Sequence, residues 1–294
     1  MNNCLLTTAA SLATPARLVE PGPWIGHIPF AFWLLEQARP QRSLVELGTH
    51  SGNSYFAFCQ GVLENGLTTR CYAIDTWEGD HQSKSYGEEV YQSVTSYNNQ
   101  HYGNFSSLLR MRFDEALPLI PDRSIDLLHI DGLHTYEAAR HDFESFRQKL
   151  SDSAIVLFHD TAVREKDFGV WRLWEELSAQ LPHLNFTHSS GLGVLFVGKS
   201  QAPSLEPLLE MLQSRQGRDL VMQYFERLGQ VVELKWQNAK LAQRLQRRER
   251  HIEEVRRSFS WRLTGPLRIA GRQLGRLLPS WTSGKVVASP LFRD

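Results

Sequence analysis

The sequence lacks several features that would place it in a specialised class of protein. It has 3 cysteines in 294 residues, too few for a disulfide framework or a cysteine-rich metal site. It contains no run of about 18 apolar residues, so we expect no transmembrane helix. Its first residues show no basic stretch followed by an apolar core, so we expect no secretory signal. These absences favour a globular, cytoplasmic protein.

Two common binding signatures are also missing. The chain has no G-x-G-x-x-G dinucleotide motif, which counts against the alternative of a nicotinamide-dependent oxidoreductase. Its basic residues are not interleaved with several stacking aromatic residues, so we do not expect nucleic acid as a partner.

The net charge of zero conceals a strong asymmetry. Residues 235–294 contain 14 Lys and Arg against 4 Asp and Glu, whereas the remaining 234 residues contain 18 basic and 28 acidic ones. An acidic globular part followed by a basic tail is therefore expected. From the changes in composition we predict four regions: a packing segment (1–40), a main domain (41–200), a helical segment (201–260) and a basic tail (261–294).

The main domain alternates between strand-like and helix-like segments. The predicted strands are 43–47, 70–74, 109–113, 126–130, 154–158, 184–188 and 193–198, and the predicted helices lie near 53–64, 86–108, 136–149 and 170–181. Such alternation is typical of an α/β fold with a largely parallel sheet and helices on both faces. Only Ser189, Ser190 and Gly191 separate the last two strands, so these should pair antiparallel.

The first predicted strand runs into a glycine-containing loop. It reads Glu46-x-Gly48-x-x-x-Gly52 and leads directly into a helix-like segment. Glycine tolerates backbone angles that a Cβ would forbid, and a helix N-terminus presents free N–H groups. The layout resembles motif I of class I S-adenosylmethionine (SAM) methyltransferases and implies a Rossmann-like seven-stranded sheet. The resemblance implies SAM contacts from this stretch: Glu46, Gly48, Thr49, Ser51, Gly52 and Asn53.

Two further stretches fall where this class of enzyme holds the rest of SAM. The second strand ends at Asp75-Thr76-Trp77, where a carboxylate can accept hydrogen bonds from both ribose hydroxyls. A simple turn or cap role for Asp75 is the alternative. The pair Phe113-Asp114 follows the third strand at the adenine position, although Asp114 is equally suited to cap the next helix.

Acidic residues follow two predicted neighbouring strands. Asp131 ends the fourth strand and Asp160 ends the fifth, so both should lie at the ligand-binding edge of the sheet. Two such carboxylates repel each other unless a cation lies between them, and oxygen ligands favour Mg²⁺. Asp131 would then act with the metal on an acceptor hydroxyl. His134, three residues later, is the candidate base that removes its proton.

These stretches resemble one group of methyltransferases more closely. The run from Ile130 to Asp142, with Phe158-His159-Asp160-Thr161 downstream, is similar to macrocin-type sugar O-methyltransferases and related bacterial glycan methyltransferases. The resemblance implies Asp131, Asp160 and Thr161 as Mg²⁺ ligands. Macrocin-type and catechol-type enzymes place Asp or Asn where this chain has Thr161.

Several polar residues near these motifs have more than one reading. His129 lies inside a strand and is expected to be a core residue, whereas Asp142 is expected to pair with a nearby Arg. The polar stretch 77–103 is a candidate lid over the acceptor, where Asp80 and His81 are placed to touch a sugar.

The C-terminal region has a different pattern. Apolar and seam residues recur at alternating spacings of three and four: Val231, Leu234, Asn238, Leu241, Leu245, Arg248, Ile252, Val255 and Phe259. This series predicts a coiled coil and a homo-oligomer through 230–259, with an amphipathic helix packed on the domain as the alternative. Residues 258–294 mix apolar with basic side chains and resemble a segment found after coiled coils in bacterial glycan-assembly proteins. We expect them to contact a glycosyltransferase partner or the inner face of the membrane, with a solubilising tail as the alternative.

Together these features predict a SAM-dependent O-methyltransferase of sugar hydroxyls in bacterial surface-glycan synthesis, with Mg²⁺ assisting. The alternative is an inactive methyltransferase-like scaffold that recruits glycan-assembly partners through its coiled coil.

Overall fold

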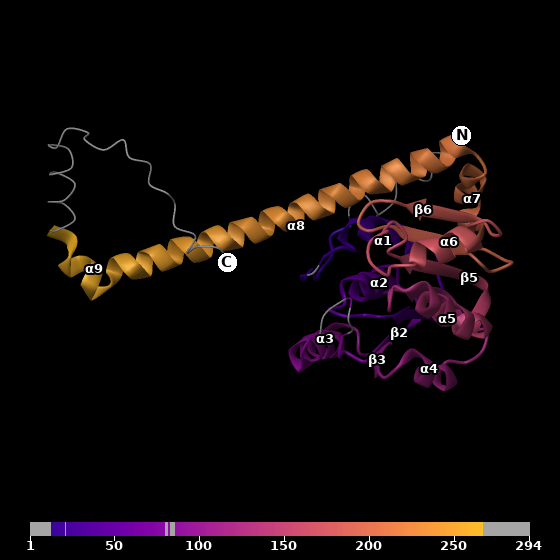
Figure 1. The fold of residues 1–294 in the computed structure, drawn as a ribbon, viewed down its shortest axis with the longest axis horizontal. Coiled ribbons are helices and arrows are strands. Elements are labelled where there is room, and N and C mark those ends of the chain that lie inside the picture. Colours follow the sequence, from indigo (N-terminus) through magenta and orange to yellow (C-terminus); the bar gives the residue numbers. More distant parts are fainter. Residues whose placement is uncertain (1–12, 21, 80–81, 83–85, 267–294) are drawn as a thin grey trace. The chain divides into compact units, whose positions relative to one another are not determined.

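A computed structural model describes residues 13–20, 22–79, 82 and 86–266. Seven strands form one sheet in the order β3-β2-β1-β4-β5-β7-β6 (Figure 1). The strands are β1 (Ser43–Leu47), β2 (Arg70–Asp75), β3 (Ser106–Arg110), β4 (Ile125–Ile130), β5 (Leu150–His159), β6 (His183–Phe186) and β7 (Leu192–Phe196). The first five strands are parallel, and β7 is antiparallel to both β5 and β6. The expected class I methyltransferase sheet is confirmed, including its antiparallel hairpin.

Helices cover both faces of this sheet (Figure 1). The α-helices of the described residues are α1 (Ile28–Ala38), α2 (Asn53–Glu64), α3 (Glu88–His101), α4 (Phe113–Ala116), α5 (Tyr136–Phe146), α6 (Val170–Ser178), α7 (Glu206–Leu212), α8 (Arg215–Arg257) and α9 (Phe259–Leu263), of which α9 and the end of α8 lie outside the part that covers the sheet. Side chains of α1, α2, α7 and the first part of α8 form the apolar core on one face. Those of α4, α5 and α6 form the core on the other. Strands β1 and β4 are buried at every residue, which explains their nearly continuous apolar sequence.

Helix α1, which precedes the first strand, packs against α8, which follows the last strand. Its Phe30 and Trp33 rings lie 5.2 and 5.5 Å from the ring of Phe225 on α8. All three side chains are fully buried. Such aromatic pairs contribute about 1 kcal/mol each beyond the burial of their surface, so the early part of α8 is a structural member of the core.

The third strand and the helix before it differ from the sequence prediction. The helix ends at His101 instead of continuing to 108, and β3 begins at Ser106 instead of 109. Tyr102 and Gly103 form the turn, and the backbone N–H of Phe105 donates to the carbonyl of Tyr102 at 3.0 Å. The apolar residues of 105–109 suit a helix face and a strand equally well, and pairing with β2 decides for the strand.

The chain divides into two units, Met1–Trp236 and Gln237–Asp294. In the second unit α8 continues to Arg257, and large apolar side chains along it are exposed to solvent, among them Leu241, Leu245 and Ile252. Within the described residues, no helix combines the length and the apolar character needed to cross a membrane.

Candidate active site

A cavity of about 650 Å³ opens at the carboxyl ends of the central strands. Its wall is formed by the loops that follow β1, β2, β4 and β5, and it includes Thr49, Asp75, Asp131 and Asp160. This edge of an open parallel sheet is where ligands bind, and the volume suits a cofactor with part of a second substrate. The cavity is therefore the candidate active site.

The loop after β1 is held against the end of β4. Gly48 and Gly52 have φ angles of +86° and +82°, a region that favours glycine. A Cβ on Gly48 would overlap the backbone carbonyl of Asp131. Gly48 therefore lets the glycine loop and the end of β4 come together. This packing requirement adds to the close approach of a ligand that the sequence suggested for this glycine.

Asp75 at the end of β2 fixes the same loop from the other side. Its Oδ2 accepts hydrogen bonds from the backbone N–H groups of Thr49 and His50 at 2.9 and 2.8 Å, and its Oδ1 accepts from Trp77 N at 2.7 Å. Asp75 also lines the cavity. The carboxylate thus shapes the loop, and its predicted contact with the ribose stays a prediction.

Other predicted cofactor residues also line the cavity: Gly48, Thr49, Ser51, Asn53, Thr76, Phe113 and Asp114. The amide of Asn53 is bonded to the backbone of Val19, with Oδ1 accepting at 2.9 Å and Nδ2 donating at 2.7 Å. The hydroxyl of Thr49 is buried and has no hydrogen-bond partner among the described residues. An unpartnered buried hydroxyl costs about 1–3 kcal/mol, so a ligand in this cavity has a polar group to satisfy.

Three of the predicted cofactor residues, Gly52, Trp77 and Glu46, do not line the cavity. At Gly52 an added Cβ would meet the ring of Phe56. Trp77 is buried, and its Nε1 donates to the carbonyl of His50 at 2.9 Å, so it supports the loop from behind. Glu46 is fully buried, and its Oε2 lies 2.7 Å from Nδ1 of His129. Their positions beside the glycine loop give them a supporting role in place of direct contact.

The Glu46 pair extends to the N-terminal segment. Trp24 Nε1 donates to His129 Nε2 at 3.2 Å, so the proton of this imidazole lies on Nδ1 and is donated to Glu46. Burial raises the pKa of Glu46, against the effect of the bond from His129. His129 is fully buried, as expected of a core residue. Trp24 also lines the cavity, so this network connects the N-terminal segment with the site.

Another part of the cavity wall is formed around the start of α4. Helix α4 begins at Phe113 and its N-cap is Arg112, whose backbone N–H donates to Glu115 Oε2 at 2.9 Å. The alternative prediction of Asp114 as the N-cap is therefore wrong, because Asp114 already lies in the first turn. Its carboxylate instead accepts a hydrogen bond from His141 Nε2 at 2.9 Å.

Asp142 on α5 is a member of this end that the sequence did not reveal. The expected Arg partner is wrong: Asp142 is buried and has no hydrogen bond or ion pair with any described residue. It lines the cavity next to Phe113 and Gly132. Burial raises the pKa of Asp142 to about 7. A carboxyl group that is neutral over part of the physiological range can both donate and accept a hydrogen bond.

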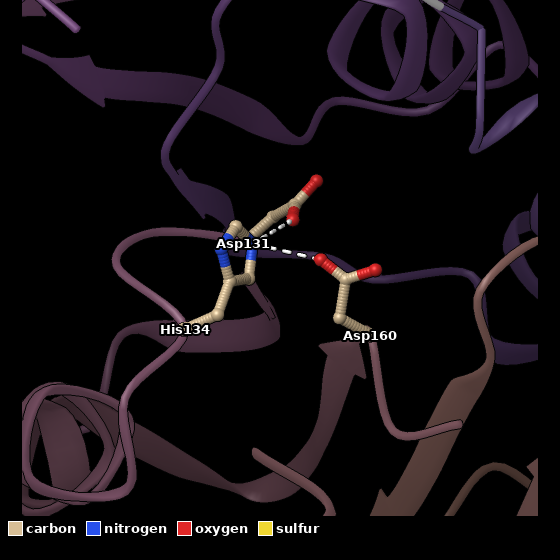
Figure 2. Close-up of side chains that lie close together, drawn as sticks. All are labelled: Asp131, His134 and Asp160. Atoms are coloured by element: carbon tan, nitrogen blue, oxygen red, sulfur yellow. Dashed lines mark hydrogen bonds and ion pairs between the residues drawn. The ribbon is translucent and has the colours of Figure 1, made fainter. Parts of the chain in front are cut away.

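At the acceptor end, one imidazole lies between two carboxylates, as Figure 2 shows. His134 Nε2 is 2.8 Å from Asp160 Oδ2 and 3.3 Å from Asp131 Oδ1. The backbone places His134 just after β4, before Thr135 caps α5 by accepting a bond from Ala138 N at 3.2 Å. The ends of β4 and β5 thus bring together Asp131, His134 and Asp160, the residues predicted to act on the acceptor hydroxyl.

A second imidazole completes this group. His159, the last residue of β5, places Nδ1 at 3.2 Å from Asp131 Oδ1 and 3.5 Å from Asp160 Oδ1. Asp160 has a φ of +60°, an uncommon conformation that turns the chain at the strand end. This turn lets His159 and Asp160, neighbours in the sequence, face the same centre.

The four groups hold one another in charged forms. Burial favours neutral carboxyls, but the charge of His159 and the bonds from both imidazoles hold the pKa of Asp160 at about 2 and that of Asp131 well below its usual range. Burial also opposes charged imidazoles, yet the bonds to both carboxylates raise the pKa of His134 to about 9. The pKa of His159 is likewise raised, by the charges of Asp131 and Asp160.

This arrangement does not fit the magnesium site that the family resemblance implies. Asp131, His134 and Asp160 do bring three potential ligand atoms within 4.8 Å of one another. However, Mg²⁺ prefers oxygen ligands, and the position between the carboxylates is taken by His134 Nε2. The third expected ligand, Thr161, donates its hydroxyl proton to Asn185 Oδ1 at 2.8 Å.

The candidate lid contributes residues that the sequence did not single out. Gln82 Oε1 accepts from the backbone N–H of His134 at 2.9 Å, and the Tyr86 hydroxyl lies 3.4 Å from Asp75 Oδ1. In the sequence, the only indication that Gln82 and Tyr86 belong to the site is their position in the polar stretch 77–103. The two residues predicted to touch a sugar, Asp80 and His81, lie outside the described residues.

The sequence around this site is similar to a known protein family. Residues 45–161, which include the glycine loop and both strand-end carboxylates, match a family described as a methyltransferase domain. The sheet, with its antiparallel β7, has the class I methyltransferase fold, and the matched stretch is similar to a methyltransferase domain over about two-fifths of the chain.

Individual relatives are similar over different parts of the chain. The protein y4gI of Sinorhizobium fredii (strain NBRC 101917 / NGR234), described as uncharacterized, is 47% identical over 243 residues. The match covers 83% of this chain, which spans about a quarter (26%) of the length of that relative.

Solved structures with a similar fold include two O-methyltransferases. TomG of Streptomyces achromogenes, solved with SAM, shares 16% identity with a TM-score of 0.44, covering 67% of this chain and 91% of TomG. CalS11, a TDP-rhamnose 3′-O-methyltransferase of calicheamicin biosynthesis, shares 16% identity with a TM-score of 0.45, covering 59% of this chain and 78% of CalS11.

Proposed function

We propose that this protein transfers a methyl group from SAM to a sugar hydroxyl. One observation carries the proposal: a single cavity holds the glycine loop and Asp75 together with His134, which lies within hydrogen-bond distance of a carboxylate at the end of β5. The glycine loop and Asp75 suit a nucleoside-containing donor. His134 with its neighbouring carboxylate suits removal of a proton from an oxygen nucleophile.

The residues of the loop fit SAM. The buried Thr49 hydroxyl, which has no partner among the described residues, offers SAM a polar group, and Asp75 lines the same cavity. Phe113 and Asp142 offer an apolar ring and a carboxyl group where the adenine would lie. Bound SAM supplies an electrophilic methyl carbon, whose bond to sulfur breaks as the acceptor oxygen forms its bond to that carbon.

His134 is the proposed general base. In its neutral form, Nε2 takes the proton that the acceptor hydroxyl loses as the oxygen attacks. The resulting imidazolium is stabilised by Asp160 at 2.8 Å and Asp131 at 3.3 Å. The ring of Phe168 stacks on His134 with 4.8 Å between centroids and 4° between planes, which fixes the orientation of the imidazole. General bases of this kind contribute roughly 10²–10⁴-fold to rate.

The sugar acceptor rests on chemistry and on resemblance. A sugar hydroxyl is weakly acidic, so it needs a base such as His134 at its side. The sequence from Ile130 to Asp142 resembles that of sugar O-methyltransferases of bacterial glycan synthesis. We propose a carbohydrate or glycan acceptor, and residues 258–294 as the contact with a glycosyltransferase or the inner membrane face. Of the latter stretch, residues 267–294 lie outside the described residues.

Calorimetry with S-adenosylhomocysteine tests the donor site first. Micromolar binding to the wild-type protein is expected, with a loss of about tenfold or more in Asp75→Ala. Transfer of labelled methyl groups to a panel of nucleotide sugars and lipid-linked glycans then tests the acceptor, with His134→Ala as the inactive control. A wild-type protein that binds no S-adenosylhomocysteine would contradict the proposal and favour the scaffold alternative.

A further inference from the structure

We propose that Asp131, Asp160, His134 and His159 form a metal-independent centre in which two imidazolium rings replace the divalent cation between the carboxylates. This inference rests on the proposed function, because it concerns how the same site activates the acceptor. It is carried by the hydrogen-bond partners of the four ring nitrogens, which leave no lone pair for a metal.

His159 must carry a proton on both nitrogens. Its Nε2 lies 3.2 Å from the carbonyl oxygen of Ser189, and its Nδ1 lies 3.2 Å from Asp131 Oδ1. A carbonyl oxygen and a carboxylate oxygen are both acceptors. Each ring nitrogen therefore donates, and a ring with two N–H groups is an imidazolium. The side chain is only 2% exposed, so solvent cannot supply other partners.

The same reasoning applies to His134. Its Nε2 faces Asp160 Oδ2 at 2.8 Å, and its Nδ1 faces Gln82 Oε1 at 3.0 Å. The orientation of the Gln82 amide is fixed, because its Nε2 donates to Asp167 Oδ1 at 2.8 Å and its Oε1 accepts from His134 N at 2.9 Å. Gln82 Oε1 is thus an acceptor, and His134 also donates through both nitrogens.

A neighbouring histidine supports this distribution of protons. His27 Nε2 lies 3.1 Å from the same Ser189 carbonyl, and its ring centroid is 5.8 Å from that of His159. Burial, followed by the charge of His159, lowers the pKa of His27. The carbonyl of Ser189 thus accepts from a neutral ring and from a charged one, and the positive charge stays on the ring that faces Asp131.

The charges of the centre balance without a metal. Two carboxylates and two imidazolium rings sum to zero, so the repulsion between Asp131 and Asp160 is already compensated. A bound Mg²⁺ would have to displace an imidazolium or add two uncompensated charges to a buried site. Thr161, the remaining candidate ligand, is committed to Asn185.

The two rings have different tasks in this centre. Both rings line the cavity, but His159 is only 2% exposed and keeps the carboxylates ionised, whereas His134 is 16% exposed and is the ring that an acceptor can reach. When His134 loses its proton, the centre keeps two negative charges and one positive charge. The excess negative charge favours the return of a proton to His134, which is what a general base requires.

Nitrogen NMR and metal binding on the 294-residue chain test the inference together. With ¹⁵N-labelled histidine at pH 7, both ring nitrogens of His159 should show protonated shifts, assigned by their loss in His159→Gln. The EDTA-treated protein should give no binding heat with MgCl₂ or MnCl₂, and elemental analysis should find no bound divalent metal. Methyl transfer should be unchanged by EDTA.

Binding of one Mg²⁺ or Mn²⁺ per chain at micromolar affinity, lost in Asp131→Asn and Asp160→Asn, would overturn the inference. So would a neutral His159 ring in the NMR spectrum, which needs no variant that folds poorly. Binding of S-adenosylhomocysteine is measured in the same samples. Its absence would count against the proposed function, whereas the ring protonation would still decide the nature of the centre.

Discussion

Gly48 packs so closely against Asp131 that a Cβ on Gly48 would overlap the carbonyl oxygen of Asp131. This contact joins the glycine loop to Asp131, which directly follows β4. It explains why β1 and β4, which are adjacent in the sheet, end in two parts of one site. Any residue larger than glycine must push the loop and Asp131 apart.

Gly48→Ala should therefore impair both stability and donor binding. The φ of +86° and the overlap with backbone atoms together should cost roughly 2–5 kcal/mol in the free energy of unfolding. Gly66→Ala is the matched control, because Gly66 has a φ of +59° but no atom near the added Cβ. It should cost about 1–2 kcal/mol. Urea unfolding of the two variants makes the comparison, and equal losses would show that the Asp131 contact is unimportant.

Asp75→Asn should weaken donor binding by disturbing the loop. The carboxylate accepts backbone N–H groups of Thr49, His50 and Trp77, and an amide can accept through only one of its two terminal atoms. Charge-assisted bonds of this kind are worth about 1.5–3 kcal/mol, so the affinity for S-adenosylhomocysteine should fall by roughly 10–100-fold. Asp152→Asn is the control, because Asp152 is an exposed carboxylate paired with Arg123 and does not line the cavity. Unchanged affinity by calorimetry in Asp75→Asn would remove Asp75 from the donor site.

The rate of methyl transfer should increase with pH until about pH 9. The base must be neutral, and the pKa of His134 is raised to about 9 by its bonds to Asp131 and Asp160. Below that pH the neutral fraction of His134 grows tenfold per pH unit, and the turnover should grow with it. Asp160→Asn should move this rise to lower pH, since it removes the bond at 2.8 Å. The turnover should be measured at about pH 6 to pH 9. If it does not change with pH over that range, His134 is not the base.

The elements and motifs at the strand ends were predictable from sequence because parallel strands end at a common edge. Asp131, Asp160 and His134 meet for that reason alone. The role of Glu46 was not predictable without the strand register. Glu46 pairs directly with His129 on β4, so both side chains point to the same face of the sheet and bond to each other instead of facing the cavity.

The contact of His159 with Asp131 and Asp160 was also not predictable from the sequence. Alternation along a strand predicts that His159 and Asp160 point to opposite faces. The left-handed conformation of Asp160 breaks that alternation at the strand end, and nothing in the sequence marks it. Asp142 was missed because a helical carboxylate usually finds a basic partner, whereas here Phe113 and Gly132 pack against it.

Asp142→Asn should stabilise the protein at alkaline pH. The pKa of Asp142 is raised by burial to about 7, so the folded chain holds a proton that the unfolded chain releases. The resulting stability is fully present below about pH 4 and is lost as the pH rises through 7. At pH 8 the variant should therefore be more stable than the wild type, by up to roughly 4 kcal/mol.

A surface carboxylate provides the control for this comparison. Asp152 forms an exposed ion pair with Arg123, and Asp152→Asn should change stability by less than about 1 kcal/mol at either pH. Urea unfolding at pH 5 and at pH 8 measures both variants. If Asp142→Asn is no more stable relative to wild type at pH 8 than at pH 5, Asp142 is ionised in the folded protein without penalty.

The exposed apolar side chains of α8 lead to the last prediction, on self-association. Leu234, Leu241 and Leu245 are 57%, 56% and 54% exposed, and they recur at the three-and-four spacing of a coiled-coil seam. We propose that a second copy of this chain covers them. Burying each such leucine contributes about 1.5–3 kcal/mol, so replacing two of them with Asp should weaken association at least a hundredfold.

The double variant Leu241→Asp with Leu245→Asp should therefore change the mass of the particle. Light scattering should report a smaller species than for the wild type, with the affinity for S-adenosylhomocysteine unchanged because both residues lie outside the first unit. Gln243→Asp with Gln246→Asp adds the same charge at exposed positions outside the seam and should leave the mass unaltered. If wild type, seam variant and control all have the same mass, a partner other than a second copy must cover the leucines.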